Sequence, residues 1–551
     1  MKNISVLLLV LLIACQQTPK EPVTFIPDWI PYDESAEILA NTENESPRMR
    51  YKLIQSKVSD KNDIWKNLKD QIGYFSAEEY ESLKPLILEQ DIPTIQSKIQ
   101  SGKLSYEKLT QWYLYRIVKF ENDKDLYLNA IISINPQAVA IARERDKNKS
   151  ENEHPIYGMP VLLKDNVNFK GLPTTAGAVA LKDNLSEKSS FIVERIEEKG
   201  GIILGKVNLS EWANYLANVN PNGYSAIGGQ TLNPYGRKIH DTGGSSAASG
   251  VSMAANYAAV AVGTETSGSI LSPSSSNSVV GLKPTIGLLS RSGIVPISST
   301  LDTPGPMTRN VTDNAILLSA MAGEDIEDPA TKGNPKKVAY FESLRSGSLA
   351  GVRFGVITSF MEDSLYKISL DKITEAGAEL VEVSPDPMNF DGFVTLLSAD
   401  MKVDLPDYLN KYGSAKVPFK NVADIAAFNL QDTTINIPYG QGRFDHINET
   451  NLSMDELLAL RDSVNSRGVA FFKQFMENNE LDGVLSVNNW NAGQAAAAKY
   501  PCLTVPMGYT DEGRPMGLTF IARPFEEDKL LKWGYAFEQL MKSRKIPVDF
   551  Q

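Results

Sequence analysis

Apolar residues at helical spacing predict two helices near the start of the globular body. Ile95, Ile99 and Leu104 recur at close to the helical period, and a second apolar set repeats at i, i+3 and i+4. Ser105 precedes the second helix and is expected to be its N-cap. Ser105 and Lys108 also form an S-x-x-K pattern, which marks a nucleophile and its base in penicillin-binding proteins. At the start of an amphipathic helix we favour the capping role. The second set consists of Leu109, Trp112, Tyr113 and Ile117.

Farther along, short apolar runs alternate with helical segments. Runs typical of buried strands are MPVLLK, GIILGKVN, AVAVGTE, VRFGVI, AELVEV, DGVLSV, CLTVPMGY and GLTFIARP. Helices are predicted for SSFIVERIEEKGG, SSAASGVSMAANYAA and the stretches Asp455–Asn478 and Glu526–Met541. Such alternation indicates an α/β layered fold with a largely parallel or mixed sheet. No internal repeat or domain boundary is evident, so one large domain is expected.

The N-terminus has the pattern of a secretory signal. Lys2 supplies a positive charge, and the apolar run that follows is too short to span a bilayer. The run ends in LIAC, which resembles the lipobox of bacterial lipoproteins, with Cys15 as the lipidated residue. A plain signal peptide that contains a cysteine is the alternative. The expected segments are a signal peptide at 1–14, a tether at 15–32, an N-terminal helical extension at 33–90 and the main domain at 91–551.

Composition excludes several classes of function. A net charge of −12 argues against nucleic acid, which a basic surface would bind. Two cysteines and three isolated histidines argue against a disulfide framework and a metal site. GGIILGK fits G-x-x-x-x-G-K, but Val207 stands where a nucleotide-binding loop needs Ser or Thr. We therefore expect no metal, no cofactor and no nucleic-acid partner, and contact with a membrane only through the anchor.

A Gly- and Ser-rich segment from about residue 242 to 284 carries the candidate chemistry. It contains apolar runs that a flexible linker would lack, so it is expected to be packed. Ser269 lies in GTETSGSI and Ser245 in GGSSAASG, while Lys164 ends the upstream strand in VLLKDN. A serine hydroxyl needs a base to become nucleophilic, and burial would lower the pKa of a lysine enough to provide one. The alternatives are a Lys164 that extends to solvent and a Ser269 segment that is only a tight turn.

From about Asp91 to the C-terminus the sequence resembles the amidase signature family. The matching pieces are YGMPVLLKDNV, GKVNLSEW, the run from GGSSAASG through GTETSGSI to LDTPGPMTRNVTD, and AAAAKYPCLTVPMGYTDEGRPMGLTFIARPFEEDKLL. Within the family, GTET-x-GSI and NIPYGQ are similar to the peptide amidases. The resemblance implies that residues 91–551 form a single amidase catalytic domain, with a central twisted mixed sheet covered by helices on both faces.

The resemblance also implies a Ser–cis-Ser–Lys triad made of Ser269, Ser245 and Lys164. Neutral Lys164 would draw a proton through Ser245, and Ser269 would attack the amide carbonyl to form an acyl-enzyme that water hydrolyses. The peptide bond at the bridging serine would be cis.

Backbone N–H groups around the nucleophile would form the oxyanion hole, namely those of Thr266, Ser267, Gly268 and Ser269. Two positions in GTETSGSIL depart from the family pattern. Many members have Gly where Ser267 stands and Arg where Leu271 stands. The missing arginine disfavours strongly acidic substrates.

The resulting hypothesis is a lipid-anchored amidase of the bacterial cell envelope, as a periplasmic or outer-membrane lipoprotein. Its substrate would be the C-terminal amide of a peptide or another small acyl amide. One alternative is an amidotransferase subunit like that of the glutaminyl-tRNA system. Another is a binding lipoprotein that kept the fold without activity. The acyl chain, the leaving amine and the oligomeric state are left open by the sequence.

Overall fold

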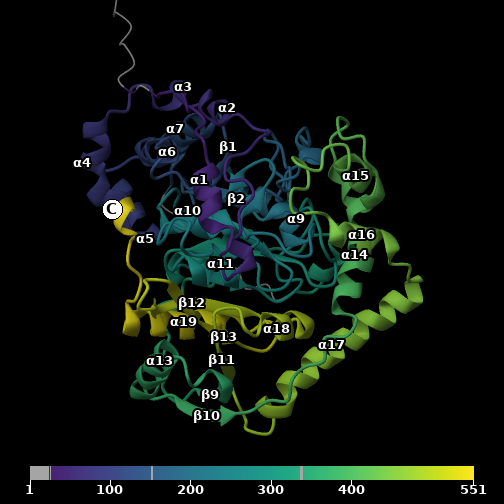
Figure 1. The fold of residues 1–551 in the computed structure, drawn as a ribbon. Helices are drawn as coiled ribbons and strands as arrows, with labels where there is room; N and C mark the ends of the chain where they lie inside the picture. The colour runs from purple at the N-terminus through teal and green to yellow at the C-terminus, as the bar shows by residue number, and fades with distance from the viewer. Residues whose placement is uncertain (1–23, 25, 151–152, 335–338) are drawn as a thin grey trace, which may run out of the picture.

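A computed structural model describes residue 24 and residues 26–150, 153–334 and 339–551 (Figure 1). The predicted signal peptide at 1–14, its lipidation residue Cys15 and much of the predicted tether lie outside the described residues. Within the described part of the chain, no helix combines the length and apolar character that crossing a bilayer requires.

Eleven strands of the described residues form one mixed sheet. β2 pairs in parallel with β3 and β6, and β9 pairs in parallel with β10 and β11, whereas the remaining pairs are antiparallel. In Figure 1 the β1 end of the sheet lies near the N-terminal helices and the β10 end lies farthest from them. In order across the sheet the strands are β1 (Ile131–Ile134), β3 (Ile202–Val207), β2 (Pro160–Lys164), β6 (Val260–Glu265), β8 (Thr303–Thr308), β7 (Val280–Lys283), β12 (Cys502–Tyr509), β13 (Pro515–Ile521), β11 (Gly483–Val487), β9 (Arg353–Ile357) and β10 (Glu379–Val383).

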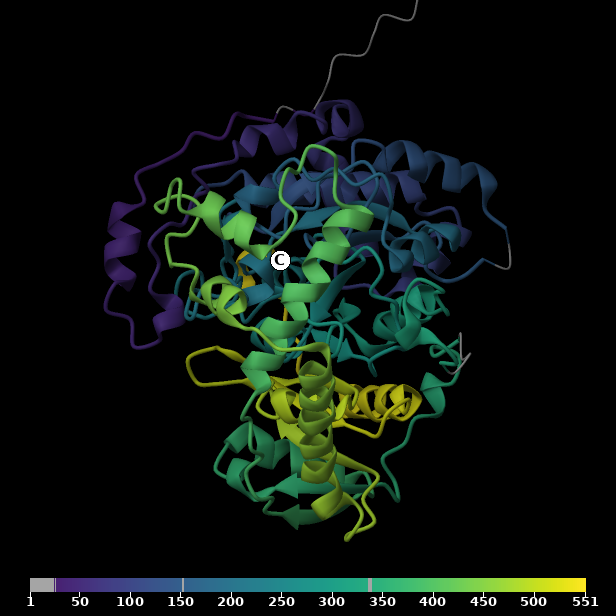
Figure 2. The same ribbon diagram turned by 90° about the vertical axis from the view of Figure 1, so that its right-hand side faces the viewer.

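Helices flank this sheet, and the predicted α/β fold is confirmed. In Figure 2 the helices between residues 393 and 476 lie in front of the sheet, and α14 packs on α16 and α17. A separate small hairpin joins β4 (Tyr224–Ser225) to β5 (Gly229–Gln230). The helices are α1 (Ser35–Asn41), α2 (Lys61–Trp65), α3 (Lys69–Ile72), α4 (Ala77–Ile87), α5 (Ile92–Gln100), α6 (Tyr106–Glu121), α7 (Ala138–Asn148), α8 (Phe191–Glu198), α9 (Glu211–Asn214), α10 (Ala247–Ala254), α11 (Leu271–Ser276), α12 (Val311–Met321), α13 (Ser364–Glu375), α14 (Phe393–Tyr412), α15 (Val422–Asn429), α16 (Gly442–Glu449), α17 (Met454–Met476), α18 (Ala492–Ala498) and α19 (Glu527–Met541). Short 3₁₀ helices are η1 (Pro47–Met49), η2 (Val179–Leu181), η3 (Pro329–Thr331), η4 (Leu344–Ser346), η5 (Thr358–Phe360) and η6 (Val548–Phe550).

The strands that carry the candidate chemistry are buried along their whole length. β2, β3 and β6 have no exposed residue, which explains their nearly continuous apolar sequences. α10, built largely from Ala, Ser and Gly, packs on β2, β3, β6 and β8. The small side chains allow this helix to approach the sheet closely.

The segment at 33–90 packs into the main body rather than only on its surface. Trp65, Leu68, Ile72 and Phe75 are buried in the largest hydrophobic core together with residues of α6. Ser105 caps α6, since its hydroxyl accepts a hydrogen bond from the Lys108 N–H at 3.1 Å, as predicted. The N-terminal segment and the main domain therefore share one core.

Candidate active site

Lys164 ends β2 and is fully buried, so the alternative in which it extends to solvent is wrong. Its Nζ lies 2.8 Å from Ser245 Oγ, 2.8 Å from Thr264 Oγ1 and 3.1 Å from the Thr264 carbonyl. Burial lowers the pKa of this amine to about 7, against an opposing effect of the Asp302 and Glu265 charges. Near neutral pH a large fraction of Lys164 is therefore an uncharged amine that can accept a proton.

Thr264, in β6, fixes the position of the lysine. Its hydroxyl also accepts from Asn166 Nδ2 at 3.0 Å. Its backbone is held by Ser246, whose hydroxyl donates to the Thr264 carbonyl and accepts from the Thr264 N–H. Because Ser246 precedes α10, these bonds tie the start of the helix to the strand beside Lys164.

Ser245 is buried between the lysine and the loop that carries Ser269. The Gly244–Ser245 peptide bond is cis, as the resemblance implies. Gly243 has a φ of 63°, and a Cβ there would lie 2.7 Å from backbone atoms of Pro273. Only glycine therefore fits this close approach between the Ser245 loop and α11.

Ser269 follows β6 in a loop held by a buried carboxylate. Glu265 accepts hydrogen bonds from the N–H groups of Gly268 at 2.7 Å, Ile270 at 2.7 Å and Leu271 at 3.0 Å. The Ser269 carbonyl accepts from the Ser246 N–H at 3.1 Å. The loop is thus a rigid support for the Ser269 hydroxyl and more than a simple turn.

The predicted oxyanion hole differs from the structure at Gly268. Its N–H donates to Glu265 and is therefore already used. The N–H groups of Thr266, Ser267 and Ser269 donate no hydrogen bond within the described residues. These three donors are therefore free to bind an acceptor.

The three predicted catalytic residues lie in one region without forming a complete hydrogen-bonded chain. Lys164 contacts Ser245, and the N–H of Ser246, the next residue, donates to the Ser269 carbonyl. No hydrogen bond between the hydroxyls of Ser245 and Ser269 is present in the described part of the structure. In enzymes without substrate such catalytic contacts are often long and shorten in the complex.

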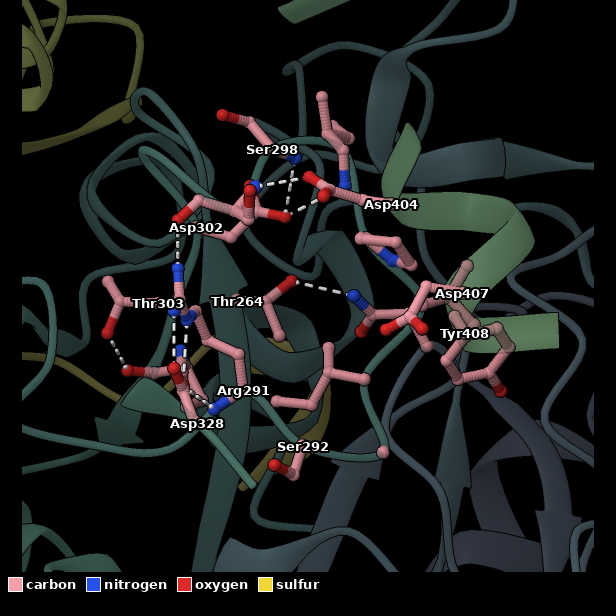
Figure 3. A pocket seen from close by; sticks show the side chains of 18 of the residues that line it. Thr264, Arg291, Ser292, Ser298, Asp302, Thr303, Asp328, Asp404, Asp407 and Tyr408 are labelled. Atoms are coloured by element: carbon pink, nitrogen blue, oxygen red, sulfur yellow. Dashed lines mark hydrogen bonds and ion pairs between the residues drawn. The ribbon is translucent and has the colours of Figure 1, made fainter. Parts of the chain in front are cut away.

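Ser269 opens into a cavity of about 250 Å³, called here the serine cavity. A second cavity of about 310 Å³, the acidic cavity, has Thr264, Asp302 and Asp404 in its walls (Figure 3). Asn166 also lines it. Thr266, Ala213 and Ile297 line both cavities, so the two adjoin at these residues. Ser269 therefore lies in the wall of one cavity, and Thr264, the hydrogen-bond partner of Lys164, lies in the wall of the adjoining one.

The GGIILGK segment forms no nucleotide-binding loop. Lys206 lies inside β3, and its Nζ is 3.1 Å from Oδ1 of Asp165, with both side chains fully buried. No group of three or more metal-binding side chains is found in the described ranges.

Sequence reasoning missed the residues that support the three candidates. Thr264 and Glu265 lie inside the quoted motif GTETSGSI, where an acceptor beside a buried lysine and a carboxylate before a turn could have been noted. Asp302, in the segment LDTPGP, has no local signal. Arg48, which lines the serine cavity, comes from a polar segment without any recognisable motif.

A model of the family described as Amidase matches residues 108–474. A probable amidase of Arabidopsis thaliana is 35% identical over 483 residues, covering 84% of this chain and 92% of the plant protein. A glutamyl-tRNA(Gln) amidotransferase subunit of Lysinibacillus sphaericus is 29% identical and covers 83% of this chain and 98% of its own length.

Solved structures of amidases are also similar to this chain. An amidase family protein from Bacillus anthracis has a TM-score of 0.85 and 35% identity, covering 90% of this chain and 99% of the other. The peptide amidase from Stenotrophomonas maltophilia has a TM-score of 0.78 and 36% identity, covering 84% and 98%.

Proposed function

Since this chain belongs to the amidase family and hydrolyses amide C–N bonds, we propose that it does so through Lys164, Ser245 and Ser269. The observation that carries the proposal is the contact of 2.8 Å between Nζ of the fully buried Lys164 and Ser245 Oγ. A buried amine whose pKa is about 7 is a suitable base for a serine at neutral pH.

In the first step the Ser269 Oγ attacks the carbonyl carbon of the amide. The Ser269 proton passes to Ser245, while the Ser245 proton passes to the neutral amine of Lys164. The carbonyl oxygen becomes an oxyanion, which the free N–H groups of Thr266, Ser267 and Ser269 stabilise. A new Oγ–C bond has formed, and Lys164 is now an ammonium.

In the second step the C–N bond breaks and the proton returns through Ser245 to the leaving nitrogen. The products are the amine, or ammonia, and an ester of the acyl group on Ser269. Water then attacks this ester, with Lys164 again taking a proton through Ser245. Breaking the ester bond restores the Ser269 hydroxyl and releases the acid.

For the substrate we favour a peptide C-terminal amide or another small acyl amide. This is supported by the 36% identity to a peptide amidase over 98% of its length and by the small serine cavity. The 29% identity to an amidotransferase subunit keeps a second candidate, in which the same site would hydrolyse glutamine within a complex. A hydrolase should act without a partner subunit, whereas the amidotransferase candidate predicts partner-dependent activity.

We further propose that the enzyme is a lipoprotein of the bacterial cell envelope. The support is the LIAC pattern ending at Cys15. Labelling of cells with a radioactive fatty acid should mark the full chain and should be lost in Cys15→Ser. Cys502→Ser, which changes a buried cysteine, is the matched control. Label that persists in Cys15→Ser would contradict the anchor.

Amide hydrolysis is tested with the full chain purified in mild detergent. Ammonia and amine release is measured over peptide amides, aryl amides and fatty amides. Ser269→Ala should abolish turnover, and Ser245→Ala and Lys164→Ala should each lower kcat roughly 10³-fold or more because the proton relay is broken. Ser101→Ala, an exposed serine, is the control and should retain full activity. Full activity in a folded Lys164→Ala protein would contradict the mechanism.

A further inference from the structure

Arg48 brings a positive charge from the N-terminal segment to the serine cavity. It lies in η1, and its Nη1 donates to the Asn220 carbonyl at 3.3 Å and to Asn222 Oδ1 at 3.1 Å. The side chain is half-buried and lines the same cavity as Ser269. Among the described residues that line this cavity, Arg48 alone carries a charge.

The guanidinium is not neutralised by direct contact with a carboxylate. No ion pair to Arg48 occurs in the described portion of the chain. Asp241 is the acidic neighbour, but the Asn222 amide stands between them and donates to both Asp241 oxygens, at 3.1 and 3.0 Å. The Gly243 N–H also donates to Asp241. Asp241 is thus engaged, and its charge does not occupy the Arg48 N–H groups.

From these contacts we infer that Arg48 binds a carboxylate of the substrate. A guanidinium has five N–H donors, and the hydrogen bonds to Asn220 and Asn222 use only Nη1. The remaining edge can hold a carboxylate through two parallel bonds. This inference rests on the proposed function and adds a substrate class to it, namely amides that carry a carboxylate near the scissile bond.

The inference reverses the expectation drawn from Leu271. That expectation considered only the segment after the nucleophile, where many family members carry arginine. Here the cation comes from residue 48, which precedes the 108–474 region matched by the family model. Because Arg48 and Ser269 line the same cavity of about 250 Å³, we expect the carboxylate to lie close to the scissile amide.

Two pairs of probes locate the carboxylate. In the first pair, acetyl-Glu-Ala-amide and acetyl-Gln-Ala-amide differ in charge on the acyl side. In the second pair, acetyl-Ala-Gly and its methyl ester differ in charge on the leaving side. Binding to the full chain carrying Ser269→Ala is measured by isothermal titration calorimetry, so that no probe is consumed.

The charged member of one pair should bind about ten- to a hundredfold more tightly than its neutral partner, because hydrogen bonds to charged groups are the strong ones. Arg48→Met should remove this preference, and Arg48→Lys should retain part of it. Arg50→Met removes a nearby exposed charge and should leave the preference unchanged. Equal binding within both pairs, or a preference that persists in Arg48→Met, overturns the inference.

Kinetic measurements on the enzyme with Ser269 intact distinguish this inference from the proposed function. Arg48→Met should lower the ratio of kcat/KM for the charged over the neutral substrate. If Arg48 only supported Asn222, both substrates would slow equally and the ratio would stay constant, which counts against the inference. Charge-dependent binding without any amide cleavage would refute the proposed function while supporting the role of Arg48. Cleavage that depends on Ser269, with the same kcat/KM ratio in Arg48→Met as in the parent, would support the proposed function and refute the role of Arg48.

Discussion

The pH dependence of the reaction follows from the burial of Lys164. With a pKa of about 7, roughly half of the amine is neutral at pH 7, about nine tenths at pH 8 and about 1% at pH 5. At the ordinary value of 10.5, only about 0.03% would be neutral at pH 7, so burial increases the active form more than a thousandfold. Because the proposed base acts when uncharged, we expect activity to rise as the pH rises through 7.

The assay is kcat/KM for ammonia release between pH 5 and 9, which reports groups on the free enzyme. We expect a rise of about 90-fold from pH 5 to pH 8. Asp302→Asn should move the midpoint to lower pH, because the Asp302 charge raises the pKa of Lys164. Asp407→Asn, an exposed residue of the acidic cavity paired with Lys411, is the control. A flat profile over this range, in a folded enzyme, would refute Lys164 as the base.

Two further predictions concern stability. Glu265→Gln should lower the free energy of unfolding by about 2–3 kcal/mol and kcat/KM by more than about tenfold, because the carboxylate that holds the Ser269 loop is lost. Urea unfolding measures the first effect and initial rates measure the second. A variant equal to the parent in both would contradict this role of Glu265. Lys164→Met should be inactive yet more stable. The folded pKa of Lys164 lies below the unfolded value, so the stabilisation is largest below pH 7, at up to about 5 kcal/mol, and fades as the pH rises toward 10.5. Urea unfolding at pH 6 and pH 9 measures it, and a gain that grows with pH would show that the sign is wrong.

Much of the sheet could be predicted because its strands are continuous apolar runs bounded by Gly or polar residues. The predicted strands at β2, β3, β6 and β9 to β13 are confirmed. β8 was missed because its sequence, TPGPMT, contains two prolines, which are rare inside a sheet. Pro304 and Pro306 are two residues apart, so their nitrogens face the same side of the strand and the donors of Gly305 and Met307 face the other. β8 can therefore lie inside the sheet, although its sequence pattern does not predict a strand.

The candidate site likewise contains residues that the sequence could predict and residues that it could not. Lys164, Ser245 and Ser269 belong to short motifs, so sequence could single them out. Their supports depend on residues that only the folded chain brings near, and the clearest case is Arg48, which lies 221 residues before Ser269 in the sequence. Neither periodicity nor spacing marks such a residue. Likewise the occupied N–H of Gly268 follows from the position of the Glu265 side chain, which a motif does not specify.

The abundance of small residues around the site has a physical reason that connects packing to chemistry. A Cβ on Gly250 would lie 2.7 Å from the Pro273 carbonyl oxygen, and one on Gly263 would lie 2.6 Å from the Met307 sulfur. α10, α11 and the strands beside them are thus closely packed, and Lys164 at the end of β2 is fully buried. Burial lowers the pKa of the lysine, and it also destabilises the folded state by disfavouring the ammonium. In the proposed mechanism the dense Gly- and Ser-rich packing therefore supplies the base, and the stability lost by burying Lys164 is offset by the large apolar core around it.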